Sequence, residues 1–255
     1  MFPTRVSGWS DGGDRVGGAI ARAASATGVD FSYLMSQAKL ESGFNPDAKA
    51  RTSSATGLFQ FIDQTWLATV KKHGSGHGLG WAAGAITQGA DGRYRVADPA
   101  ARQAVLDLRR DPDAASAMAA EFAADNQAHL EKKLDRPVES VDLYLAHFLG
   151  AGGAAKFLSA MDANPGLRAD AVAPAAARAN RSVFYERDGS PRSLAEVRGR
   201  FAAKMGGSAP LPASRPAADF PAVRMAALDT DGLSLSRPSP AFARLAYLML
   251  ADLGA

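Results

Sequence analysis

The chain has 255 residues, no cysteine, and a formal net charge of only +3 from 29 basic and 26 acidic side chains. The length is enough for one or two domains with a sizeable core. The missing thiols exclude a disulfide scaffold, a cysteine-ligated metal site and thiol catalysis, and the weak, dispersed charge argues against a nucleic-acid partner. Alanine accounts for 54 residues, and because Ala favours helices and is depleted in strands, we expect a mainly α fold.

Short amphipathic stretches separated by Gly and Pro predict a bundle of helices rather than a repeat array. Asp30 is placed to cap the second helix, and two Asp-Pro pairs mark the starts of later ones. The Gly-rich stretch 74–96 shows little periodicity and is predicted to be a long surface loop. No apolar run is long enough to span a membrane. The predicted helices cover about residues 14–27, 31–41, 57–72, 99–109, 112–134, 137–149, 154–161, 174–180 and 194–205.

The composition changes after residue 205. Six of the 14 prolines fall between residues 206 and 240 without helical periodicity, which is typical of a flexible linker. A final helix, apolar on nearly all sides, then begins at Ser239. We therefore expect a helical domain over 1–205, a flexible Pro-rich linker over 206–238 and a C-terminal apolar helix over 239–255. This helix either folds back on the domain or docks on a partner or a second copy.

Glu41 is the strongest candidate for a catalytic residue. On a helix over 31–41, four apolar residues share one face: Phe31, Leu34, Met35 and Ala38. Glu41 extends this face by another i+3 step. Burial on an apolar face raises the pKa of a carboxyl group, and so does its position near the negative end of the helix dipole. Both effects suit a general acid that works near neutral pH. The alternative is a solvated residue at a frayed helix end.

Two linked motifs lie on either side of a small-residue turn. The run ESGFNP from Glu41 to Pro46 is followed by TGLFQ from Thr56 to Gln60. Together they closely resemble the motifs of the soluble lytic transglycosylases, the lysozyme-like enzymes that cut peptidoglycan. The resemblance is tightest over residues 30–70 and continues more loosely to about residue 200. It implies a lysozyme-like helical domain in which Glu41 is the catalytic residue, with no cofactor.

The resemblance also implies a set of substrate-binding residues. Gln60 would bind sugar amides or hydroxyls. By its residue type, Phe59 either offers an apolar surface to a pyranose ring or belongs to the core. The gap before Gly57 is about one residue longer than usual, so Thr52, Ser53 or Ser54 takes the position of the family's serine. Ser42 would hydrogen-bond either the end of the helix or the Glu41 carboxylate.

A third family motif differs in this chain. The usual Ala-Tyr-Asn reads Ala146-His147-Phe148 here. The tyrosine that normally lies close to the catalytic Glu would then be replaced by Tyr144 or by His147, and both alternatives stay open.

The resemblance implies cleavage without water. Glu41 would protonate the β-1,4 bond between MurNAc and GlcNAc, the N-acetyl group of the substrate would assist, and the Glu41 carboxylate would take the proton of the 6-hydroxyl to give 1,6-anhydroMurNAc. Ordinary glycosidases need two carboxylates, whereas Asp47 and Asp63 are expected to be solvated here. The alternatives are a hydrolytic muramidase of the goose-lysozyme kind and a non-catalytic wall-binding protein of a flagellar or secretion system, recruited through residues 239–255.

Three further features bear on metals, ligands and location. His73 and His77 have the spacing of metal ligands, but the glycines around them argue against a shared helix face, so we expect no metal site. Trp81 is a candidate lid or stacking platform in the Gly-rich loop. The substrate implies the periplasm or cell envelope, yet the first residues lack the layout of a secretory signal. We therefore expect export to be absent, unconventional or directed by a segment outside this chain.

Overall fold

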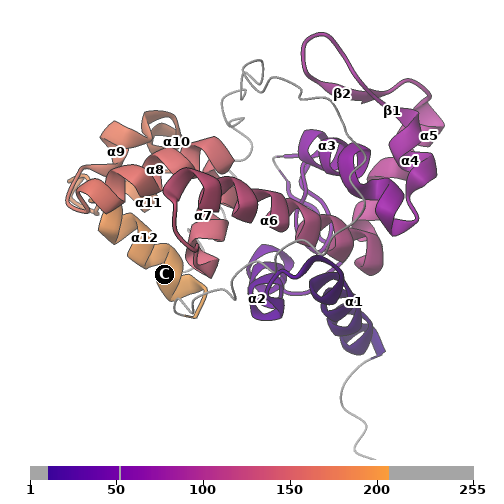
Figure 1. Cartoon of the computed structure of the whole chain (residues 1–255), viewed down its shortest axis with the longest axis horizontal. Helices are drawn as coiled ribbons and strands as arrows, with labels where there is room; N and C mark the ends of the chain where they lie inside the picture. Colours follow the sequence, from indigo (N-terminus) through magenta and orange to yellow (C-terminus); the bar gives the residue numbers. More distant parts are fainter. Residues whose placement is uncertain (1–10, 52, 207–255) are drawn as a thin grey trace, which may run out of the picture. The chain divides into compact units, whose positions relative to one another are not determined.

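The computed structural model describes residues 11–51 and 53–206 of the chain (Figure 1). Over these residues it holds twelve α-helices, two short 3-10 helices and one two-stranded antiparallel hairpin, so the predicted mainly α fold is confirmed. Within the same residues no helix is both long and apolar enough to cross a membrane. The predicted linker from residue 207 onward and the predicted terminal helix over 239–255 lie outside the described residues.

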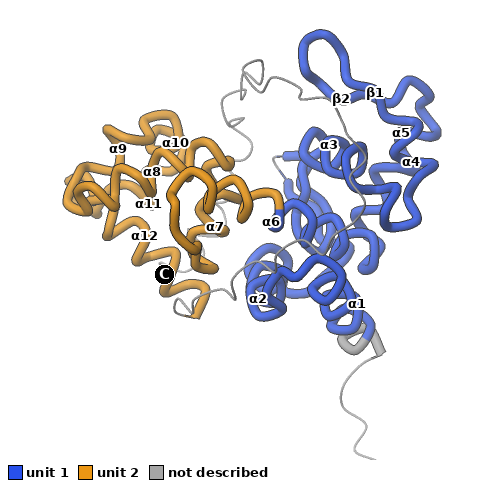
Figure 2. Tube along the Cα trace, viewed as in Figure 1, with its two compact units in different colours: residues 1–124 blue, residues 125–255 orange. Residues whose placement is uncertain are grey.

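The chain divides into two compact units, residues 1–124 and 125–255, which are described separately (Figure 2). The helix α6 (Pro112–Leu134) contains the boundary between them. The domain boundaries that the composition indicates, at residues 205 and 238, stay predictions.

Unit 1 is built around a core of large apolar side chains. The indole N–H of Trp66 donates to the carbonyl of Val105 (2.7 Å), and the Phe61 ring packs edge-on against Trp66 with 5.3 Å between ring centroids. Its elements before α6 are α1 (Asp11–Thr27), α2 (Phe31–Ser42), α3 (Asp63–His73), η1 (Gly74–His77), α4 (Gly80–Ala85), β1 (Ile86–Gln88), β2 (Tyr94–Val96), α5 (Pro99–Asp107) and η2 (Leu108–Arg110).

The helix α2 forms almost as predicted. The Asp30 carboxylate accepts a hydrogen bond from the backbone N–H of Tyr33 (2.8 Å), which confirms the predicted N-cap. The helix ends at Gly43, whose φ of 59° is left-handed and whose N–H returns to the carbonyls of Ala38 and Lys39. This is the usual way in which a glycine terminates a helix.

The predicted start of the third helix at Gly57 is wrong. Residues 57–60 form a turn, and α3 begins only at Asp63, whose N–H donates to the hydroxyl of Ser54 (3.2 Å). Gly57 and Gln60 both have left-handed backbone conformations, with φ of 84° and 48°. Such residues cannot continue a right-handed helix. The apolar residues from Leu58 onward recur at helical spacing because the side chains of the turn are buried, like those of the helix that follows.

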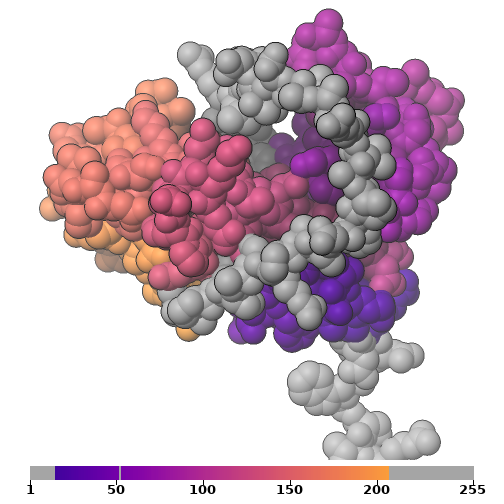
Figure 3. All heavy atoms as spheres, viewed as in Figure 1, coloured from indigo at the N-terminus to yellow at the C-terminus, as the bar shows by residue number. Residues whose placement is uncertain are grey.

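The predicted surface loop over 74–96 is also wrong. This stretch forms η1, α4 and the hairpin β1–β2, in which Ile86 pairs with Val96 and Gln88 with Tyr94. The exposed hairpin tip stands out in the space-filling view (Figure 3). The Gln64 side chain from α3 donates to the Tyr94 carbonyl and accepts from its N–H, which fixes the hairpin to α3. The Asp91-Gly92 pair between two β-prone segments was the available signal for a hairpin.

Unit 2 packs its helices around a second aromatic cluster. The Phe148 ring lies 4.9 Å from that of Phe201 and 6.4 Å from that of Phe184. The capping box of Ser193 and Glu196, predicted for the last helix, is present. Two short helices, α9 and α11, were not predicted. The elements after α6 are α7 (Ser140–Leu149), α8 (Ala151–Ala163), α9 (Ala169–Val172), α10 (Pro174–Ala179), α11 (Arg181–Phe184) and α12 (Leu194–Lys204).

A buried carboxylate joins α7 to α12 within unit 2. Asp142 is fully buried, and it accepts hydrogen bonds from Arg198 (2.8 Å), Arg136 (3.2 Å) and the N–H of Glu139 (3.2 Å). It thereby forms the capping box that starts α7 at Ser140, three residues after the predicted start at Pro137. Two guanidinium groups compensate the cost of burying this charge.

The substitution Asp142→Asn should lower the free energy of unfolding by about 3 kcal/mol, because it leaves two cationic groups without their shared buried partner. Urea unfolding followed by circular dichroism measures the change. The control is Asp162→Asn, which removes an exposed partner of the same Arg136 and should cost less than about 1 kcal/mol. Equal effects of the two substitutions would contradict the structural role of Asp142.

The substitution Gly57→Ala should destabilise unit 1 by at least about 2 kcal/mol, since φ is left-handed there. In addition, a Cβ atom would lie 1.9 Å from the carbonyl oxygen of Arg109. Thermal unfolding measures the effect. Gly84→Ala is the matched control: it lies within α4 with open space around the new methyl group, so it should stabilise the protein by up to about 1 kcal/mol. A Gly57→Ala variant as stable as wild type would show that Gly57 has neither this left-handed conformation nor this close approach to Arg109.

Candidate active site

Glu41 lies in the last turn of α2, and its side chain is buried, with 6% of the residue exposed. Burial argues against the alternative of a solvated, frayed helix end. The predicted buried face is right for Leu34, Ala38 and Glu41. Met35 is half-buried, and Phe31 is exposed at the start of the helix, so the prediction is wrong there. A carboxyl group is therefore held at the end of a helix among buried side chains.

Two more polar side chains lie on the same face of α2. Tyr33, Gln37 and Glu41 follow each other at intervals of four residues, and all three are buried. Burial raises the pKa of the Tyr33 hydroxyl, and the negative charge of Glu41 raises it further. Tyr33 therefore keeps its proton at neutral pH. The sequence interpretation treated this face as apolar, although the four-residue spacing from Glu41 could have identified both residues.

The end of α2 is hydrogen-bonded to the Gly57–Gln60 turn, which belongs to the second motif. The Ser42 hydroxyl lies 2.8 Å from the Leu58 carbonyl and 3.2 Å from the Ala38 carbonyl. Of the two roles considered for Ser42, these contacts correspond to bonding at the helix end. The contact to Leu58 connects the residue next to Glu41 with the Gly57–Gln60 turn, across sixteen positions of sequence.

Gln60 is part of the turn rather than of a helix. Its side-chain amide donates to the carbonyls of Gly57 (2.8 Å) and Ala48 (3.1 Å), and the residue is buried. The N–H of Gly57 donates to the same Ala48 carbonyl (2.8 Å). The amide of Gln60 thus joins two parts of the loop by hydrogen bonds to Ala48 and Gly57. The contact of Gln60 with sugar stays a prediction. Phe59 is buried in the core, so its ring offers no face to a pyranose in this structure.

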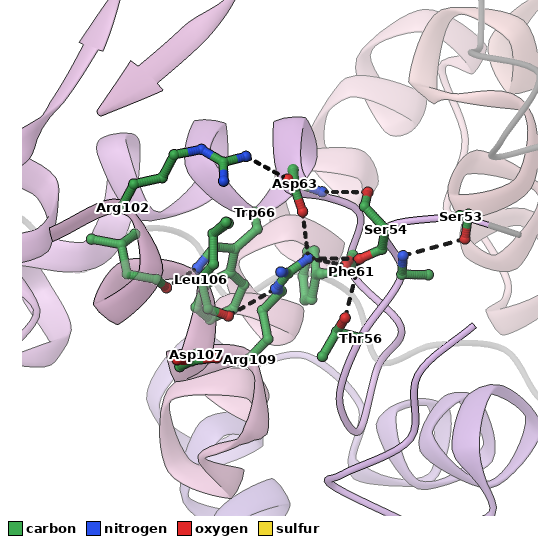
Figure 4. A network of polar contacts seen from close by, with 12 residues as sticks. Ser53, Ser54, Thr56, Phe61, Asp63, Trp66, Arg102, Leu106, Asp107 and Arg109 are labelled. Carbon is green, nitrogen blue, oxygen red and sulfur yellow. Dashed lines mark hydrogen bonds and ion pairs between the residues drawn. The ribbon is translucent and has the colours of Figure 1, made fainter. Parts of the chain in front are cut away.

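The two serines of the intervening loop have local roles. The Ser53 hydroxyl accepts from the N–H of Ala55 (3.2 Å), and that of Ser54 accepts from the first N–H of α3. In Figure 4, Ser53 lies at the edge of the network, whereas Ser54 lies within it, beside Asp63. Thr52 lies outside the described residues. The substrate contacts of Ser53 and Ser54 stay predictions.

Arg109 is a further residue of the site that the sequence did not predict. Its buried side chain reaches from η2 into the loop, where Nη1 lies 2.9 Å from each of the Ser54 carbonyl, the Phe61 carbonyl and the Asp63 carboxylate (Figure 4). Burial lowers the pKa of this guanidinium, and the Asp63 charge opposes the shift. No local pattern identifies Arg109, because its partners in the loop lie more than 45 residues earlier.

The two aspartates near the motifs have different surroundings. Asp63, expected to be solvated, pairs instead with Arg109 and with Arg102 (2.8 Å). Asp47 is exposed, as predicted, with 79% of its side chain accessible. Asp63 is therefore engaged in holding the loop.

Tyr144 and His147 lie together on α7 in unit 2. Their rings stack with 5.8 Å between centroids, and the Tyr144 ring also packs against Phe201. Tyr144 is buried and His147 is half-buried. Both remain alternatives for the role of the family's tyrosine.

His73 and His77 share one carboxylate in unit 1. The Glu121 oxygens lie 3.1 Å from Nδ1 of His73 and 2.6 Å from Nε2 of His77. Among the described residues, no group of three or more ionisable side chains is arranged to hold a metal ion. Trp81 is exposed, but it belongs to the helix α4 rather than to a loop.

The family comparison covers this part of the chain. Residues 18–80 match the family model of the transglycosylase SLT domain. The match contains Glu41 in α2, the loop closed by Gln60, and all of α3. It supports a peptidoglycan-cleaving function of the lytic transglycosylase type and a peptidoglycan substrate. The resemblance that the two motifs indicated is confirmed: residues 18–80 of this chain match the transglycosylase SLT domain, which is lysozyme-like.

Proposed function

We propose that this protein is a lytic transglycosylase that cleaves the β-1,4 bond between MurNAc and GlcNAc without water and leaves a 1,6-anhydroMurNAc end. The observation that carries the proposal is the buried Glu41 at the end of α2, inside the family match and beside the Ser42 contact to the turn. A buried carboxyl group in a fixed position is suited to proton transfer.

One carboxyl group performs both proton transfers. Protonated Glu41 donates its proton to the glycosidic oxygen while the N-acetyl group of MurNAc assists at the anomeric carbon. The resulting carboxylate then accepts the proton of the MurNAc 6-hydroxyl, while the oxygen of that hydroxyl bonds to the anomeric carbon. Glu41 ends the cycle protonated, and no water is consumed.

The surroundings of the nearby carboxylates favour this scheme over hydrolysis. A hydrolytic muramidase that follows the ordinary two-carboxylate scheme needs a positioned water and a second carboxylate. Asp63 is paired with two guanidinium groups, and Asp47 is exposed in the loop after α2. Neither is arranged as a general base.

The substrate places the proposed activity in the periplasm or cell envelope. Residues 239–255 are proposed as the segment that docks on a flagellar or secretion-system partner. The alternative of a non-catalytic wall-binding protein would keep the fold and lose the dependence on Glu41.

The substitution Glu41→Gln should reduce the rate of wall lysis by at least about 1000-fold, because it removes the acid and the base while conserving shape. Turbidity of a suspension of purified sacculi measures the rate. Asp47→Asn, in the loop after α2, is the control and should stay within about twofold of wild type. Equal lysis by wild type and Glu41→Gln would remove Glu41 from the mechanism, and no lysis by either would favour the binding role.

The released fragments should end in 1,6-anhydroMurNAc, which is one water lighter than a reducing MurNAc end. Mass spectrometry of the soluble fragments distinguishes the two ends directly. Fragments with reducing MurNAc ends would overturn the transglycosylase proposal in favour of the hydrolytic muramidase.

A further inference from the structure

Arg109 is a buried cation whose partners are mainly backbone atoms. Only 6% of the residue is exposed. Its Nη1 contacts the carbonyls of Ser54 and Phe61, and its Nε donates to the Leu106 carbonyl (2.9 Å). A guanidinium is rarely buried to this extent unless it is paired, and Asp63 supplies the counter-charge. The side chain therefore fixes the path of the main chain at these carbonyls.

The contacted carbonyls lie on both sides of the Gly57–Gln60 turn. Ser54 precedes the turn and Phe61 follows it, so a single nitrogen holds the two strands of the loop together (Figure 4). The backbone of Arg109 also packs on the turn, since a Cβ at Gly57 would lie 1.9 Å from the Arg109 carbonyl oxygen. The turn is thus held from its flanks and at Gly57 by the same residue.

The Gly57–Gln60 turn is also hydrogen-bonded to the end of α2. Its Leu58 carbonyl accepts the Ser42 hydroxyl at 2.8 Å, and Ser42 directly follows Glu41 in the last turn of the helix. A continuous series of contacts therefore runs from the Arg109 guanidinium, through the loop, to the segment that carries the proposed catalytic carboxyl group.

We infer that Arg109 is a positioning residue for glycan cleavage, which holds the Gly57–Gln60 turn so that Ser42 and the end of α2 keep Glu41 in place. The inference rests on the proposed function. Small displacements of a catalytic group can lower a rate by about 100-fold. Loosening the loop therefore acts on kcat more than on KM.

The test compares Arg109→Lys with wild type in the full 255-residue chain. Lysine keeps the charge but is one bond shorter and lacks the planar fork, so it cannot reproduce the contacts of both Nη1 and Nε. We expect kcat on purified soluble glycan strands to fall by about 10- to 100-fold, with KM within about threefold of wild type.

Two arginine controls separate positioning from general loss of stability. Arg102→Lys changes an exposed arginine that pairs with the same Asp63. Arg192→Lys changes a buried arginine of unit 2 that also holds carbonyls, those of Ser182 and Val183. Both should keep kcat within about twofold of wild type. Arg192→Lys should lower the melting temperature as much as Arg109→Lys does.

A double-mutant cycle tests the route through Ser42. Ser42→Ala breaks the contact to Leu58, and it should lower kcat in the same way as Arg109→Lys. The double variant should lose little more than the more affected single variant, because both substitutions break one series of contacts. If the fold-loss of kcat in the double variant equals the product of the two single losses, the inference is overturned.

The remaining outcomes are also decisive. Wild-type kcat in Arg109→Lys, or an equal loss in Arg192→Lys, would overturn the inference while Glu41→Gln still shows whether the proposed function holds. If Arg109→Lys does not fold, Asp63→Asn replaces it, since it removes the counter-charge and leaves the carbonyl contacts. We then expect a 3- to 10-fold lower kcat at unchanged KM, and an unchanged kcat would refute the positioning role.

Discussion

The hydrogen bond from the Ser42 hydroxyl to the Leu58 carbonyl is the contact on which the site depends most. A helix end frays unless its last carbonyls and side chains find partners. Here α2 ends at a left-handed Gly43, and Ser42 ties this end to a turn that lies further along the chain. Glu41, the residue before Ser42, is therefore fixed by the loop as well as by its own helix.

The loop in turn depends on polar contacts to its backbone rather than on regular structure. Left-handed residues at Gly57 and Gln60 reverse the chain, and the Gln60 amide closes it on the Ala48 carbonyl. The guanidinium of Arg109 then joins the two flanks. Buried backbone carbonyls need donors, and these two side chains supply them. These contacts hold the Glu41 carboxyl group in position, and proton transfer to a glycosidic oxygen requires a positioned acid.

The sequence predicted the features that local chemistry determines. Asp30 as N-cap, the box of Ser193 and Glu196, and Glu41 on a buried face all follow from short-range spacing. The start of α3 was missed because apolar spacing does not distinguish a buried turn from a helix, and left-handed residues at Gly57 and Gln60 decided the outcome. Long-range contacts such as those of Arg109 leave no periodic pattern, so they could not be predicted.

The most direct test of cleavage without water is digestion of peptidoglycan in water enriched in oxygen-18. Closure by the MurNAc 6-hydroxyl brings no solvent oxygen into the product, whereas hydrolysis adds one at the new anomeric carbon. We expect the fragments released by the wild-type protein to show no oxygen-18 at their MurNAc ends in mass spectrometry. Incorporation of one labelled oxygen per cleaved bond would contradict intramolecular closure and would show that water takes the place of the 6-hydroxyl.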